Sequence, residues 1–143
     1  MANEAHNQFS DYYSIQAAAS TADDAYSAGA QTSVLTALGA TDSKSPMLDF
    51  KVKVTVGTPA ENGVIQLYRR NSDGTDTTPA PSGNFTGDFV GSMTMDNTAT
   101  STYYHFRAVN VDPNCTYYMK NKDGVSALTI ELFVRGATYA PAA

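Results

Sequence analysis

The strongest constraint on the fold is a strict alternation of apolar and polar side chains over residues 47–56. Successive side chains of a β-strand point to opposite faces of a sheet, so this period of two predicts a half-buried antiparallel strand. The apolar side of that strand carries Leu48, Phe50, Val52, Val54 and Val56, and the polar side carries Asp49, Lys51, Lys53 and Thr55.

The same pattern recurs along the chain after turn-forming residues such as Asn62-Gly63 and Asp123-Gly124. It predicts further strands over residues 64–70, 88–95, 102–109, 115–121 and 127–135. Many short strands with one polar face are typical of an all-β sandwich or barrel, and the two-faced alternation favours an antiparallel β-sandwich, jelly-roll-like or Ig-like. Its expected core is Leu48, Phe50, Val52, Val54, Ile65, Leu67, Phe106, Leu128, Ile130 and Leu132. Phe89, Met93 and Met95 are expected on one face of their strand.

The first 32 residues differ from the rest because they show no clean period of two or of 3.6. A helix is conceivable over residues 11–19, but Ser, Thr and Asp interrupt it. We interpret residues 1–32 as an extended arm that precedes a sandwich domain of residues 33–143, and the alternative is a first strand of that domain with a frayed tail. As an arm it would dock on a neighbouring protein through the aromatic side chains of Phe9, Tyr12, Tyr13 and Tyr26.

Charge and cysteine content limit the possible partners and the compartment. The net charge is −5, and the excess lies in residues 1–49, which hold six acidic residues against one lysine. A basic patch that could release counterions from phosphates is missing from the sequence, which argues against a nucleic-acid partner. No apolar run is long enough for a membrane span. A single cysteine, Cys115, and a polar N-terminus without a secretory signal indicate synthesis in a reducing cytoplasm.

The residues needed for catalysis or metal binding are sparse. The chain has two histidines, and it contains no nucleophile-elbow, zinc-protease, phosphate-loop or dinucleotide-binding motif. Asp49, Asp88 and Glu131 are scattered on polar strand faces, so a carboxylate pair is not indicated. Residues 71–76 resemble part of a calcium loop, but the glutamate that closes such a loop is missing. We therefore expect no enzymatic activity, no cofactor and no bound metal.

Tyrosine is the most conspicuous aromatic residue, with nine copies and three adjacent pairs. In a strand each pair should place one ring inward and one outward. If Tyr103 and either Tyr117 or Tyr118 lie outward on paired strands, they form an aromatic platform for a protein partner or a sugar ring. Ordinary cross-strand pairing that stabilises the sheet is the alternative.

Residues 88–136 also carry a recognisable order of strands and turns. A strand with Gly91-Ser92 is followed by a Tyr104-His105-Phe106 strand, an Asp112-Pro113 turn, a Tyr117-Tyr118-Met119-Lys120-Asn121 strand, a Lys122-Asp123-Gly124 turn and a last alternating strand. This order resembles that of small β-sandwich decoration or cement proteins, which bind the outside of the capsids of tailed bacteriophages.

The resemblance implies a structural virion protein without catalysis or cofactor. It implies localisation on the capsid surface after synthesis in the host cytoplasm. The expected partners are the major capsid protein and further copies of the chain, as a dimer or trimer, contacted through Phe9, Tyr12, Tyr13, Tyr26, Tyr103 and Tyr117. The alternative is a carbohydrate-binding β-sandwich module of a phage tail or surface appendage, although the absence of tryptophan counts against sugar stacking.

Overall fold

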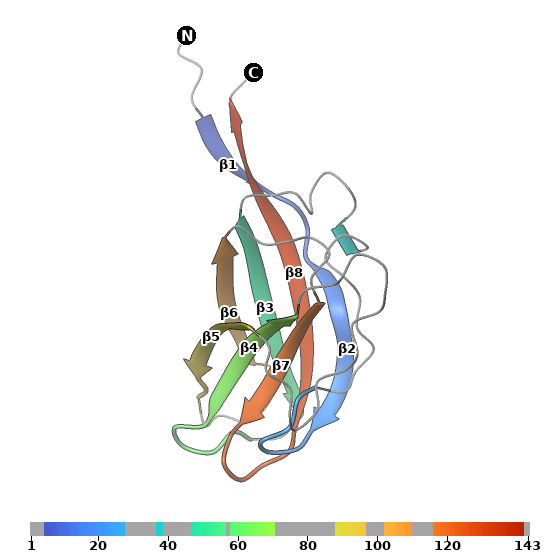
Figure 1. Cartoon of the computed structure of the whole chain (residues 1–143), viewed down its shortest axis with the longest axis vertical. Coiled ribbons are helices and arrows are strands. Elements are labelled where there is room, and N and C mark those ends of the chain that lie inside the picture. The colour runs from blue at the N-terminus through green and yellow to red at the C-terminus, as the bar shows by residue number, and fades with distance from the viewer. Residues whose placement is uncertain are drawn as a thin grey trace.

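The chain folds into strands that form two antiparallel sheets (Figure 1). The computed structural model describes residues 5–27, 37–38, 47–56, 58–70, 88–96, 102–109 and 116–141. The strands are β1 (Ala5–Phe9), β2 (Tyr13–Thr21), β3 (Met47–Val56), β4 (Val64–Arg70), β5 (Asp88–Thr94), β6 (Thr102–Val109), β7 (Thr116–Lys122) and β8 (Leu128–Pro141). The prediction of an all-β antiparallel sandwich is confirmed. Within the described ranges, no helix is long and apolar enough to cross a membrane.

The five-stranded sheet is organised around β8, its longest strand. On one side β8 pairs with β3, which in turn pairs with β6. On its other side β8 pairs with β2 over its first half and with β1 over its last residues. In Figure 1 the three-stranded sheet, in the order β5-β4-β7, lies against the lower part of this sheet, and β1 and the end of β8 project beyond it together.

The described part of the N-terminal segment belongs to the sandwich instead of forming an extended arm. Residues 5–9 and 13–21 are strands of the larger sheet, and Tyr26 forms a bridge with Lys120 of β7. The structure therefore agrees with the alternative interpretation, in which the N-terminal segment folds onto the domain as a strand. Residues 11–19 are not helical. The proposed boundary at residue 32 lies outside the described residues.

Register shifts explain why the sequence pattern did not reveal β2. The pairing of β2 with β8 shifts between Ser14 and Gln16 and again between Gln16 and Ala19. Two consecutive side chains, Ile15 and Gln16, are consequently both buried. An irregularity of this kind breaks the alternation on which strand prediction depends.

The core lies between the two sheets and contains every residue predicted for it. All ten predicted core side chains are buried, and they are joined by Tyr104, Tyr117, Met119 and Val134, among others. Phe50 of β3 packs against Tyr117 of β7 with 4.4 Å between ring centroids, which connects the two sheets. The apolar faces of β3 and β8 therefore point toward the three-stranded sheet, and their polar faces point away from it.

One predicted face is wrong because of a bulge in β5. The pairing of β4 with β5 shifts between Leu67 and Tyr68, whose partners are Gly91 and Phe89. Val90 is the extra residue, and Phe89 is turned outward with 56 % of its surface exposed. Met95 remains buried, so Phe89 does not share a face with it.

Two of the turns are joined by one buried carboxylate. Asp123, in the turn after β7, accepts hydrogen bonds from the backbone N–H of Ser126 in its own turn and of Ala60 before β4. Asn62 and Gly124 have positive φ angles of 63° and 89°, as the predicted turns at Asn62-Gly63 and Asp123-Gly124 require. These contacts fix the end of the sandwich opposite the termini (Figure 1).

Candidate interaction surface

The side of the larger sheet that points away from the core is rich in aromatic and cationic side chains. We call it the outer face and define it by Phe9, Tyr12, Asp49, Lys51, Lys53, Tyr103, His105, Arg107, Glu131, Phe133 and Arg135. Three adjacent strands supply most of these residues in register, because their side chains alternate with those of the core. Tyr12 precedes β2 and lies over this face.

An ion-pair row crosses the sheet at Asp49. The register places Asp49 of β3 between Arg107 of β6 and Arg135 of β8. Arg107 donates from Nε to Oδ1 at 2.8 Å, and Arg135 donates to Oδ2 at 3.2 Å. Only 7 % of the Asp49 side chain is exposed, whereas 61 % of the Arg107 side chain is. A buried carboxylate thus holds two guanidinium groups on the surface.

The next row places a lysine among aromatic rings. The ammonium nitrogen of Lys51 lies 4.3 Å from the ring centroid of Tyr12, 4.8 Å from that of Phe133 and 5.2 Å from that of Tyr103. These distances are within the range of cation–π attraction. Arg135 makes the same kind of contact with Tyr12 at 4.7 Å and with Phe9 at 4.2 Å. The cations and rings therefore form one continuous cluster.

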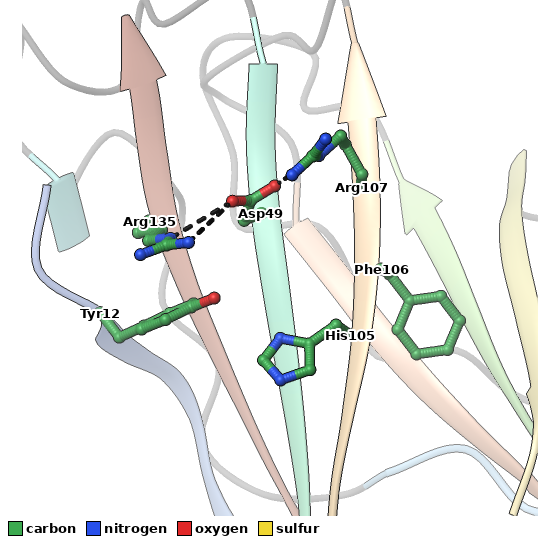
Figure 2. A pocket seen from close by; sticks show the side chains of 6 residues that line it. All are labelled: Tyr12, Asp49, His105, Phe106, Arg107 and Arg135. Atoms are coloured by element: carbon green, nitrogen blue, oxygen red, sulfur yellow. Dashed lines mark hydrogen bonds and ion pairs between the residues drawn. The ribbon is translucent and has the colours of Figure 1, made fainter. Parts of the chain in front are cut away.

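A hollow of about 360 Å³ opens between these rows. Its lining residues are Tyr12, Asp49, His105, Phe106, Arg107 and Arg135. Figure 2 shows Tyr12 and Arg135 on one side of β3 and Arg107 on the other, with the His105 ring over β3 and the Tyr12 hydroxyl directed toward that strand. The hollow has the size of a small-ligand site.

The Tyr12 hydroxyl is a neutral group beside the two arginines, and its partial burial favours the protonated form further. Desolvation raises the pKa of Tyr12 above its ordinary value of 10.0, although the positive charge of Arg135 opposes the change. Tyr12 therefore offers a hydroxyl donor beside the two arginines at neutral pH.

The structure brings some of the predicted contact residues to this surface and separates others from it. Phe9, Tyr12 and Tyr103 lie on the outer face, where Tyr103 is 45 % exposed, and Tyr13 of β2 is also exposed. Tyr26 lies by the other sheet and makes an edge contact with Tyr68 at 5.5 Å. Tyr117 is buried against Phe50.

The predicted platform of Tyr103 with Tyr117 or Tyr118 does not form. Tyr103 lies on β6 of the larger sheet, whereas Tyr117 and Tyr118 lie on β7 of the smaller one. Tyr117 and Tyr118 are also both buried, so neither ring of that pair is exposed to a partner. The Tyr103-Tyr104 pair places one ring outward, since Tyr104 is buried.

Sequence reasoning did not assign a role to Asp49, Lys51, Arg107, Phe133 or Arg135. Their common signal is position on the polar side of an alternating strand, which any solvent-facing residue also has. What joins them is the register of β3 with β6 and β8.

The other candidate sites from the sequence, a metal site, Cys115 and the loop of residues 71–76, do not add to this surface. Within the described ranges, no group of three His, Cys, Asp or Glu side chains could hold a metal ion. Cys115 and the loop of residues 71–76 lie outside those ranges. No protein-family model matches the sequence, and no curated protein is significantly similar to it.

Proposed function

We propose that this chain is a structural protein that binds the outer surface of a tailed-phage head and stabilises it. Its partner would be the major capsid protein, with self-association as a dimer or trimer on the capsid lattice. The observation that carries the proposal is the outer face, where exposed aromatic side chains alternate with cations. Tyrosine, phenylalanine and arginine are the residues enriched where proteins contact proteins.

The cations favour a protein partner over a sugar. A sugar ring stacks on an open aromatic face, but the Tyr103 ring already has Lys51 at 5.2 Å and Lys53 at 5.6 Å. The Tyr12 ring likewise lies near Lys51 and Arg135. Carbohydrate binding is therefore the competing function that an experiment must separate.

Cosedimentation with phage heads tests the proposal directly. Heads of the virus that encodes the chain, prepared without this protein, are mixed with the purified chain, and a parallel sample contains host surface polysaccharide. We expect saturable binding to heads and none to polysaccharide. Binding to polysaccharide alone, or to neither, would refute the proposal.

Matched aromatic substitutions then locate the surface. Tyr103→Ala removes an exposed ring from the outer face and should weaken binding to heads about fivefold or more. Phe89→Ala removes an exposed ring from the smaller sheet and is the control. Equal losses for the two variants would show that the outer face is not the docking surface.

A further inference from the structure

The arginines of the hollow keep hydrogen-bonding capacity that no described residue uses. Arg107 contacts Asp49 through Nε, and its two terminal nitrogens have no partner among the described residues. Arg135 uses Nε and Nη2 on a single Asp49 oxygen, and its Nη1 has no hydrogen-bond partner within the described ranges. Both guanidinium groups line the same hollow, together with the Tyr12 hydroxyl and the His105 ring (Figure 2).

The charge in the hollow favours an anion. Two guanidinium groups face one carboxylate, whose two oxygens are each occupied by one arginine. One positive charge is therefore left over. Lys51, which lies on β3 as Asp49 does, adds a second positive charge next to the hollow. The planar fork of a guanidinium group matches a carboxylate, because both groups can form two parallel hydrogen bonds.

We propose that this hollow binds the carboxylate of an aspartate or glutamate side chain presented by a protein partner. The inference rests on the proposed function, since it gives the chemistry by which the outer face recognises its partner. Asp49 holds the arginines in place before binding, which lowers the entropic cost of ordering them.

The surroundings favour an acidic side chain over a nucleic-acid phosphate or an acidic sugar. A polyanion would be repelled by the chain as a whole, whose net charge is −5. The rings next to the hollow have Lys51 or Arg135 within cation–π distance, which leaves less ring surface for sugar stacking. A single carboxylate bordered by aromatic contacts is the arrangement of a buried charge at a protein interface.

The test is an NMR titration of the full chain with small probes. N-acetyl-glutamate α-amide supplies one side-chain carboxylate, and N-acetyl-glutamine α-amide is the neutral control. We expect saturable shifts of the Arg107 and Arg135 side-chain signals with the glutamate probe, with a dissociation constant on the order of millimolar. Equal shifts with the glutamine probe, or none with either, would overturn the proposal.

Two further anions and two variants identify the source and the site. Glucuronate or inorganic phosphate binding tighter than the glutamate probe would overturn the assignment to a protein side chain. Arg107→Gln should weaken binding of the glutamate probe about tenfold or more, because it removes the exposed guanidinium group. Lys122→Gln removes an equal charge from β7 and should leave binding unchanged. A loss of the same size in both variants would contradict a specific site.

These measurements separate the two proposals. If the glutamate probe binds but heads do not, the capsid function fails while the carboxylate site stands. If heads bind the Arg107→Gln variant as tightly as the unaltered chain, the carboxylate proposal fails while the capsid function stands.

Discussion

Asp49 shows how one residue can serve stability and surface chemistry together. Its carboxylate is nearly inaccessible, while its partners Arg135 and Arg107 are exposed to different extents. Removing Asp49 leaves the less exposed Arg135 guanidinium without its acceptor, whereas after removal of the exposed Arg107 the carboxylate keeps Arg135 as its counterion. The two sides of this ion pair should therefore differ in their effect on folding.

We expect Asp49→Asn to lower the free energy of unfolding by about 1–3 kcal/mol. Arg107→Gln should lower it by less than about 1 kcal/mol, because the Arg107 side chain is 61 % exposed. Chemical denaturation of both variants measures the two values. Equal losses would show that the burial of Asp49 does not control the energetics of this row.

A second ion pair should make stability depend on pH. Hydrogen bonds from Lys122, at 2.6 Å, and from Lys120 hold the pKa of Asp24 below its ordinary value of 3.8. The Asp24 carboxylate in turn raises the pKa of Lys122 above 10.5. A lowered carboxyl pKa stabilises the fold above pH 3.8 and stops doing so as the pH falls through the folded value. A raised lysine pKa stabilises the fold below pH 10.5, and this contribution is lost as the pH rises through the folded value.

The melting temperature of Asp24→Asn should therefore lie slightly below that of the unaltered chain at neutral pH. The difference in melting temperature should disappear at about pH 2, where Asp24 becomes protonated. It should also disappear in roughly 1 M salt, because both side chains are exposed to solvent and salt screens their attraction. Thermal unfolding over a pH series measures it. A difference that is constant from neutral pH to about pH 2 would contradict the assignment to this pair.

At the scale of elements, the turn at Asn62-Gly63 packs closely against the turn that follows β7. A Cβ atom placed on Gly63 would lie 2.5 Å from Oδ1 of Asp123 and 3.1 Å from the carbonyl oxygen of Ala60. The same Asp123 oxygen accepts the hydrogen bond from the Ala60 N–H, so it has little freedom to move. Glycine is required at position 63 because two turns meet there.

We expect Gly63→Ala to lower the free energy of unfolding by about 1–3 kcal/mol, since the methyl group displaces a hydrogen-bonded carboxylate. Asn62→Gly, at the neighbouring exposed position with positive φ, should change it by less than about 1 kcal/mol, because glycine adopts this φ without strain but raises the entropy of the unfolded chain. Urea denaturation compares them. In an Asp123→Ala background the cost of Gly63→Ala should shrink, and an undiminished cost would show that Asp123 is not its cause.

At the scale of the whole molecule, β8 connects the N-terminal strands to the rest of the sandwich. It pairs with β3 on one side and with β1 and β2 on the other. β2 contributes the buried side chains of Ile15, Gln16 and Thr21 to the molecule. The N-terminal strands are thus part of the folded unit, although they show the weakest pattern in the sequence.

A variant that lacks residues 1–26 should lose roughly 10 °C or more in melting temperature, or should not unfold cooperatively. It loses the strand pairing on one edge of β8 and the burial of Ile15, which by itself contributes about 2–5 kcal/mol. Phe9→Ala, which removes a 40 % exposed side chain, is the control with a small effect. A truncated chain with an unchanged melting temperature would show that β1 and β2 do not stabilise the sandwich.

The alternation of side chains determined much of the fold without tertiary information. The predicted segments 47–56, 64–70 and 102–109 coincide with β3, β4 and β6, and all ten predicted core residues are buried. The physical reason is local, because a strand with one apolar side can bury only that side. Where a bulge breaks the alternation, the pattern predicted the wrong face for Phe89, and it left β2 undecided between an extended arm and a first strand.

Strand register is what only the tertiary structure decided. Asp49, Arg107 and Arg135 lie far apart in the sequence, and nothing in their local pattern distinguishes them from other solvent-facing residues. They meet because β3 pairs with β6 and with β8 so that all three share one cross-strand row. The aromatic rings around Lys51 come together for the same reason, from β6, β8 and the residue before β2. Local periodicity specifies which side of a strand faces water, whereas pairing between distant segments specifies which side chains become neighbours.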